Sequence, residues 1–212
     1  GDERALLSVS TKDGDAPVDC PAVLVGGPSP AALDLEFNFP DSRSFEAESL
    51  VLGTADGIGW LLGFVLFTEA AVEDRLVVGG ADLGLVDRLE RLTAGSLVVG
   101  QGADGRVELV RSLEVAGPVV VGDAAGGEIV RSRLDLGELI IGARGSGSGQ
   151  VIVDTVLGDE ADPNLVAGDV EVGSRGFGLL EVRRPLAVGG DMLLGVHAEG
   201  LPSGWLDRGD GF

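Results

Sequence analysis

Leu97-Val98-Val99-Gly100, within SLVVGQGADGRVELVRSLEVAGPVVVG (96–122), is the stretch that decides the fold. Three apolar residues, a glycine and a second glycine at Gly105 could open a phosphate-binding loop, in which a buried strand ends in a glycine-rich turn. The same phrase, however, recurs along the chain. Its copies begin at Leu76, Leu97, Val119, Leu139, Val170 and Met192, with an imperfect copy at Leu50. A phrase that recurs at a nearly fixed period describes an architecture, not a single site.

The spacing of the copies argues against a nucleotide-binding unit. Successive copies start 26, 21, 22, 20, 31 and 22 residues apart. A strand, a crossover helix and a parallel strand need about 30 residues. Only the interval from Leu139 to Val170 reaches that length, and it has no helical apolar period. Gly105 is followed by Arg106 and not by the Lys and Ser/Thr of a phosphate-binding loop.

The residues after each second glycine alternate between apolar and polar, as half-buried strands do. One apolar residue stands two positions after that glycine, and a second, usually Leu, stands further on. The first set is Val86, Val107, Ile129, Val151 and Leu180; the second is Leu92, Leu113, Leu134 and Leu186. In the copy with extra glycines, Gly149 takes the place of the second glycine. Stacked coils would bury these residues in one continuous core.

The pattern therefore predicts an all-β fold, a right-handed parallel β-solenoid with coils of about 21 residues over 50–200. The glycines fit this geometry, because tight corners need positive φ or a residue without Cβ. An antiparallel sandwich or barrel also uses short, regularly spaced strands. The antiparallel sandwich or barrel is disfavoured because the recurring phrase stands at the same position in every repeat.

The two ends of the chain depart from the repeat. Residues 1–49 hold five of the nine prolines and the alternating stretch LDLEFNF (33–39), which we expect to be a strand. We interpret this region as an N-terminal cap or an irregular first coil, because solenoids need capped ends. Residues 201–212 form a C-terminal end segment, in which Trp205 and Phe212 would cover the last coil or mark a docking point.

Composition and charge exclude several classes of protein. The chain of 212 residues is 44% hydrophobic and contains 36 glycines, which argues against disorder. Its formal net charge is −20, so we expect no nucleic-acid partner and no binding to anionic lipid. No run of 18 uninterrupted apolar residues exists, and we expect no membrane span.

The repeat resembles that of a known class of proteins. The stretch 96–122 is similar to the glycine-rich β-solenoid repeat of autotransporter passenger domains and of bacterial surface-anchored repeat proteins. The similarity covers about residues 50–200, and this chain has more Arg and Glu and fewer Thr, Ser and Asn between its strands. The resemblance implies a secreted or surface-exposed structural or adhesive stalk, with no catalytic residues to carry over.

The chain contains few of the side chains on which catalysis commonly depends. His197, Cys20 and Lys12 are the only residues of their types, and the chain has no Tyr. Cys20 can form no disulfide within the chain, and His197 stands in a glycine-flanked turn. We therefore expect no catalytic residues, no cofactor and no enzymatic activity.

One segment gathers acidic residues between two copies of the repeat. It is DTVLGDEADPN (154–164), and its acidic members are Asp154, Asp159, Glu160 and Asp162. These four residues are the candidates for a calcium site, with an acidic surface loop as the simpler interpretation. Paired carboxylates on neighbouring coils could also cleave a polysaccharide, because glycosidases need two at about 5–9.5 Å.

Charged residues recur between the strands. Arg111 and Arg133 are expected to stack on one face, with Glu90 one coil before and Arg184 two coils on. Like charges at strand spacing need interleaved acids, so we expect a compensated surface and not an anion site. The Arg-Gly-Asp tripeptide at 208–210 is a match that chance explains in a chain rich in Asp and Gly.

These observations lead to one hypothesis and one alternative. The first is a secreted or cell-surface structural or adhesive β-solenoid, with a leader that has been removed, which assembles with itself into filaments or forms part of a larger adhesin. Its partners would be other copies, neighbouring coils of a longer chain, or surface glycans. The alternative is a polysaccharide-binding or polysaccharide-cleaving β-helix.

Overall fold

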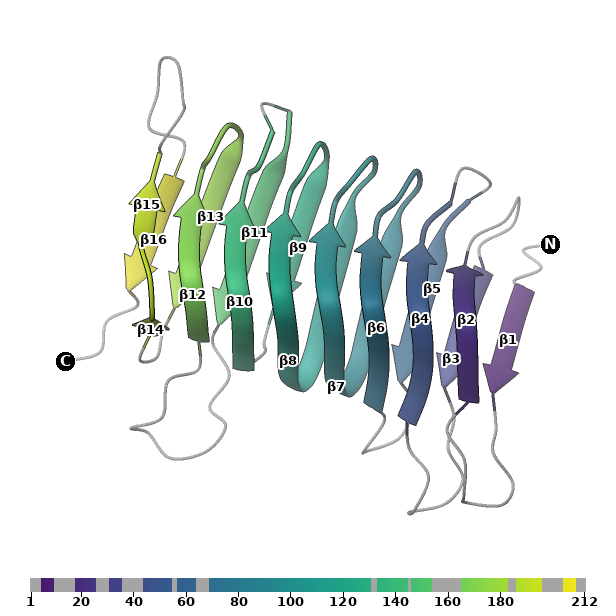
Figure 1. Ribbon diagram of the computed structural model, residues 1–212. Helices are drawn as coiled ribbons and strands as arrows, with labels where there is room; N and C mark the ends of the chain where they lie inside the picture. The colour runs from purple at the N-terminus through teal and green to yellow at the C-terminus, as the bar shows by residue number, and fades with distance from the viewer. Residues whose placement is uncertain are drawn as a thin grey trace.

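The computed structural model describes residues 5–9, 18–25, 31–35, 44–54, 57–63, 69–130, 133–144, 146–153, 165–182, 186–195 and 204–208. These residues form strands and turns with no helix among them. The strands lie in two rows that face each other, and the chain winds from one row to the other as it advances (Figure 1). The fold is a parallel β-solenoid, as the sequence predicted.

The back row of the solenoid is continuous from one end of the chain to the other. Its order is β1 (Ala5–Val9), β3 (Ala31–Leu35), β5 (Gly59–Gly63), the first parts of β7 (Gly84–Val99) and β8 (Gly105–Val121), β9 (Gly126–Val130), β11 (Ser148–Val153), β13 (Phe177–Val182) and β16 (Gly204–Arg208). Each strand pairs in parallel with the next.

The front row is built in the same way. Its order is β2 (Val18–Val25), β4 (Ser44–Leu52), β6 (Glu69–Val78), the second parts of β7 and β8, β10 (Arg133–Ile141), β12 (Leu165–Val172), and then β14 (Leu186–Val188) and β15 (Met192–Leu194). In Figure 1 the front strands run upward, the back strands run downward, and the coils advance from right to left, which makes the solenoid right-handed.

The recurring phrase lies at the end of each front strand and stacks in order. Leu97 stands opposite Leu76 on one side and opposite Val119 on the other, and Val119 stands opposite Leu139. The first residues of the phrase in β4, β6, β7, β8, β10 and β12 are buried in one core. The predicted stacking of the triplets is therefore confirmed.

The first glycine of each phrase supplies a backbone conformation that other residues rarely adopt. These glycines have φ between 67° and 79°, in the left-handed region, at Gly53, Gly79, Gly100, Gly122, Gly142, Gly173 and Gly195. The chain turns there from the front row to the back row. A side chain at this φ would be strained, so the glycine is required by the corner.

The second glycine of each phrase is required because there is no room for a side chain. Gly84, Gly105, Gly127, Gly149 and Gly178 occupy one row of the back sheet, in the register predicted from the sequence. A Cβ at Gly105 would collide with the backbone carbonyl oxygen of Val78 in the preceding coil. The chain reverses so tightly here that successive coils touch through their backbones.

A third glycine per coil, which the sequence analysis did not single out, lies in the middle of the front row. Gly95, Gly117, Gly137 and Gly168 each stand two residues before the recurring phrase. The pairings of β7 with β8 and of β8 with β10 shift register at this point. A Cβ at each would collide with a carbonyl oxygen of the preceding coil. These bulge glycines lie where the backbones of successive coils approach too closely for a Cβ.

The remaining core rows also follow the predicted alternation. Val86, Val107, Ile129, Val151 and Leu180 are all buried and stand opposite one another in turn. The leucine row runs through Leu92, Leu113, Leu134, Leu165 and Leu186. Leu165 fills the gap in the row that the sequence analysis left at this coil.

The strands of the first 49 residues pair in the same parallel manner as the later coils. Val23-Leu24-Val25-Gly26 proves to be a further copy of the phrase, since Val23, Leu24 and Val25 stand opposite Leu50, Val51 and Leu52. β3 covers the beginning of the strand expected at 33–39. The division into a cap over 1–49, coils over 50–200 and an end segment over 201–212 stays a prediction.

Within the part of the chain that the structure describes, no helix is long and apolar enough to cross a membrane.

Candidate functional site

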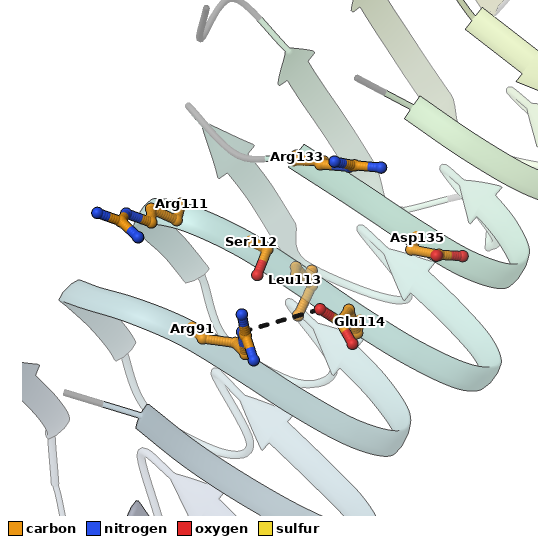
Figure 2. Close-up of a pocket in the computed structure, with 7 residues that line it drawn as sticks. All are labelled: Arg91, Arg111, Ser112, Leu113, Glu114, Arg133 and Asp135. Atoms are coloured by element: carbon orange, nitrogen blue, oxygen red, sulfur yellow. Dashed lines mark ion pairs between the residues drawn. The ribbon is translucent and has the colours of Figure 1, made fainter. Parts of the chain in front are cut away.

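The outer surface of the solenoid is hollowed where the chain bends from the back row into the front row. The hollow has a volume of about 560 Å³ and extends over β7, β8 and β10 (Figure 2). Its lining residues are Arg91, Arg111, Ser112, Leu113, Glu114, Arg133 and Asp135. All but the buried Leu113 present polar groups.

Two rows of side chains cross the hollow, because residues two positions apart on a strand point to the same side. In the first row Arg91, Ser112 and Arg133 stand opposite one another on three successive coils. In the second row Glu114 and Asp135 stand opposite each other. Neighbouring strands are about 4.8 Å apart, so the rows present chemical groups at that interval.

The charges in the hollow compensate one another. Arg91 lies 3.9 Å from a carboxylate oxygen of Glu69 and 3.9 Å from one of Glu114, the second contact being the dashed line in Figure 2. All three side chains are roughly half exposed, so these contacts are weak. The expectation of a compensated charged surface agrees with these contacts.

Glu90 and Arg111 make the tightest ion pair at this bend. The Nε atom of Arg111 lies 2.7 Å from Oε1 of Glu90, whose side chain is only 10% exposed. The other carboxylate oxygen, Oε2, is buried and has no hydrogen-bond partner among the described residues. The pair joins two successive coils, as expected from the placement of Glu90 one coil before Arg111.

The prediction that Arg111 and Arg133 stack in one row is wrong. Arg133 stands opposite Ser112, and so does Arg91. The reason is the residue count at the bend: three residues, 109–111, stand between Glu108 and Ser112, whereas only two stand between their partners Val130 and Arg133 in the next coil. This difference of one residue places Arg133 opposite Ser112 instead of Arg111. Arg184, the third arginine of that prediction, lies outside the described residues.

Other ion pairs link coils on the back row and at the turns. Arg106 contacts Glu108 on its own strand at 2.9 Å and Glu128 on the next at 3.3 Å. Arg144 contacts the largely buried Asp123 at 2.8 Å. Glu108 stands opposite Val130 in the following coil, as the sequence alignment predicted. These pairs hold successive coils in register and present no nucleophile or acid–base constellation.

The predicted calcium residues Asp154, Asp159, Glu160 and Asp162 lie outside the described residues, as does His197. Among the residues that the structure describes, no group of three His, Cys, Asp or Glu side chains is arranged to hold a metal. Cys20 is placed in β2, opposite Ala47. Trp205 and Arg208 are placed in β16, whereas Asp210 and Phe212 lie outside the description.

The C-terminal coil carries a feature that sequence analysis missed. Leu193 and Leu194 in β15 are 47% and 49% exposed. Their equivalents in inner coils lie in continuous rows of buried or half-buried residues. The sequence carried a signal for this difference, since the copy at Met192 is the last one in these 212 residues.

Comparisons with protein-family models, with curated proteins and with solved structures find no match for this chain.

Proposed function

We propose that the protein is a structural or adhesive rod that works outside the cell, secreted or held at the cell surface. The observation that carries the proposal is the unbroken register of the core rows, from the first described coil to the last. Such a stack grows in one direction by adding equal coils and provides length and stiffness. We further propose that it has no enzymatic activity.

The surface chemistry supports an exposed setting. The net charge of −20 keeps individual rods apart at low ionic strength, and the repulsion weakens as salt shortens the screening length from about 10 Å at 0.1 M to about 3 Å at 1 M. The single Cys and the single Lys leave little surface for redox or amine chemistry. The rod then binds other copies through its ends, packs against neighbouring coils of a longer chain, or binds surface glycans.

The proposal is tested on intact cells that produce the protein. Protease treatment of whole cells should remove the protein from the cell fraction, and antibodies should label unpermeabilised cells. A cytoplasmic marker in the same cells provides the control for leakage. Protection of the protein in intact cells, with digestion only after lysis, would overturn the extracellular assignment.

The hollow over β7, β8 and β10 supports polysaccharide binding or cleavage as a second candidate. Glu114 and Asp135 stand opposite each other there on strands about 4.8 Å apart. That interval is close to the separation of about 5–5.5 Å between the two carboxyl groups of retaining glycosidases. Arg91, Ser112 and Arg133 add donors at each coil step, which suits a polymer with repeating hydroxyl or carboxyl groups.

Binding to neutral and acidic polysaccharides separates this candidate from the first. A chain with Glu114→Gln and Asp135→Asn keeps the shape of the hollow and should lose release of reducing ends if the carboxylates are catalytic. Asp87→Asn with Glu181→Gln provides a control on the back row. Equal behaviour of both variants and the unaltered chain on every polysaccharide would exclude this candidate.

A further inference from the structure

The hollow over β7, β8 and β10 presents positive charge on alternate coils. Arg91, Ser112 and Arg133 form one row along the solenoid, each opposite the next. The row therefore consists of a cation, a hydroxyl and a second cation, and its two arginines are two coil steps, or about 10 Å, apart in the backbone. In Figure 2 their side chains lie on either side of Ser112. Within the hollow this row contains no acid, although the chain as a whole has a net charge of −20.

The two guanidinium groups of this row are available to a ligand. Arg133 is exposed and makes no ion pair with another residue in the described part of the chain. Arg91 is about half exposed, and its contacts with Glu69 and Glu114 are both 3.9 Å long. Such long, exposed contacts contribute little in water. A bound carboxylate can therefore replace them.

The second row of the hollow places acceptors beside these donors. Glu114 and Asp135 stand opposite each other, two residues along the strands from Ser112 and Arg133. Carboxylates accept hydrogen bonds from hydroxyl groups and repel other anions. A ligand that matches both rows has acidic groups along one edge, at every second coil, and hydroxyl groups along the other edge. The volume of about 560 Å³ lies in the range of small ligand sites, about 300–1,000 Å³.

We propose that the hollow binds an acidic polysaccharide in which a uronic acid alternates with a neutral sugar, lying along the solenoid axis. Each ring of an extended polysaccharide with equatorial linkages advances by about the interval between coils, so three coils hold three sugars. Alternate rings face the same way, so the carboxylates of the first and third sugars meet Arg91 and Arg133. A planar guanidinium donates two parallel hydrogen bonds to a carboxylate.

The same arrangement excludes a polymer that is charged at every sugar. The middle ring is turned by half a rotation, so a carboxylate on it would face Glu114 and Asp135, which repel it. A neutral middle ring instead lies at Ser112 and donates its hydroxyl groups to the acidic row. The inference rests on the polysaccharide-binding candidate of the proposed function and names its substrate class.

Three hexasaccharides with equatorial linkages test the class of ligand on the full chain. They are a hyaluronan hexasaccharide, in which glucuronate alternates with a neutral amino sugar, hexamannuronate, charged at every sugar, and neutral cellohexaose. Fluorescence anisotropy of the labelled sugars at low salt measures binding. The hyaluronan hexasaccharide should bind at least about tenfold more tightly than the other two, and added salt should weaken it. Tighter or equal binding of either other probe would overturn the proposal.

Arginine variants test the row of cations. Arg133→Gln should weaken binding of the hyaluronan hexasaccharide by at least about tenfold, because a charge-assisted pair of hydrogen bonds is lost. Arg75→Gln provides the matched control, since Arg75 is also exposed and lies in β6, outside the hollow. It makes the same change of charge and should alter binding by less than about twofold. Equal losses from the two variants would show general charge attraction and overturn the site.

A double variant tests the acidic row. Glu114→Gln with Asp135→Asn removes the repulsion and should narrow the difference between hexamannuronate and the hyaluronan hexasaccharide to under about threefold. An unchanged difference would overturn the proposed discrimination. All four substituted positions are exposed, and circular dichroism checks that the variants remain folded.

The failures are distinguishable. Binding of cellohexaose alone would overturn the acidic class and leave the polysaccharide candidate standing, whereas absence of binding to every polysaccharide would overturn both. Surface labelling of cells tests the location of the rod independently.

Discussion

The inner coils (69–141) and the last coil (186–195) use the same phrase and differ in burial. Val99 and Val121 are fully buried, whereas Leu194 in the same core row is about half exposed. The turn glycines agree closely, with φ of 76° at Gly100 and 67° at Gly195. The local backbone is therefore set by the residues of each coil, while burial is set by having a neighbour on both sides.

This comparison explains how stability is distributed along the molecule. In a solenoid each coil contacts only the coils beside it, so stability is a sum of coil terms and interface terms. An inner coil contributes through two interfaces and the last coil through one. A substitution at equivalent positions should therefore cost more in the middle than at the end, and pairs of such variants test this directly.

Substitutions in the core rows should give the largest difference in the free energy of unfolding between the middle of the stack and its end. Leu97→Ala removes buried methyl groups between Leu76 and Val119 and should lower the free energy of unfolding by about 2–5 kcal/mol. Leu194→Ala removes groups that are half in water already and should cost under about 1 kcal/mol. Urea unfolding followed by circular dichroism measures both. Equal losses would mean that the last coil is as well packed as the middle.

Most of the fold was predictable from the sequence, because the glycines and the apolar triplets each have a geometric cause. The row of second glycines is an example, since even Gly149 was assigned correctly in a copy with extra glycines. The copy at Val23 was missed because the prolines around it suggested an irregular cap. The bulge glycines were missed because Gly95 and Gly117 look like ordinary loop glycines until a neighbouring coil is placed against them.

The candidate site was far less predictable. The hollow depends on register, and a difference of one residue between β8 and the next coil placed Arg133 opposite Ser112 instead of Arg111. A bulge of this kind leaves no mark in the apolar period, because Leu109 and Leu113 stay buried on either side of it. The acidic set from Asp154 to Asp162 was singled out by composition and lies outside the described residues, so its calcium role stays a prediction.

Glycine substitutions sharpen the comparison at the backbone level. Gly168 and Gly189 follow Ala167 and Val188, which stand opposite each other. A Cβ at Gly168 would collide with the carbonyl oxygen of Gly137, whereas at Gly189 the nearest atom, the Ala167 oxygen, is 3.7 Å away. Gly168→Ala should cost about 1–3 kcal/mol, and Gly189→Ala should be close to neutral. Thermal unfolding of the two variants measures both effects. A Tm for Gly189→Ala below that of the unaltered chain would contradict the open space around Gly189.

Removing an ion pair should change the free energy of unfolding by a smaller amount, which again depends on how buried the pair is. Arg111→Ala leaves the Glu90 carboxylate largely buried and should cost about 1–2 kcal/mol. Arg88→Ala breaks the 3.4 Å contact with Asp87, in which both side chains are well exposed, and should cost under about 0.5 kcal/mol. Both arginines lie at the same bend, so they form a matched pair. Denaturant midpoints compare them, and a larger loss for Arg88→Ala would show that exposure does not govern these contacts.

The smallest effect comes from two equal hydrogen bonds, one near the middle of the stack and one at its end. Asp104 Oδ1 accepts from Gly126 N at 2.8 Å, and Asp169 Oδ1 accepts from Asp191 N at 2.9 Å. Each bond joins one coil to the next and contributes about 0.5–1.5 kcal/mol. Asp104→Ala should lower global stability by that amount, since the coils on both sides depend on the contact. Asp169→Ala should instead speed amide exchange only within 186–195 and leave the global unfolding transition in place, because the last coil can open without the others. Hydrogen exchange read by mass spectrometry separates the two outcomes. Faster exchange throughout the chain with Asp169→Ala would mean that the last coil unfolds together with the rest, and that the end of the rod is coupled to its middle.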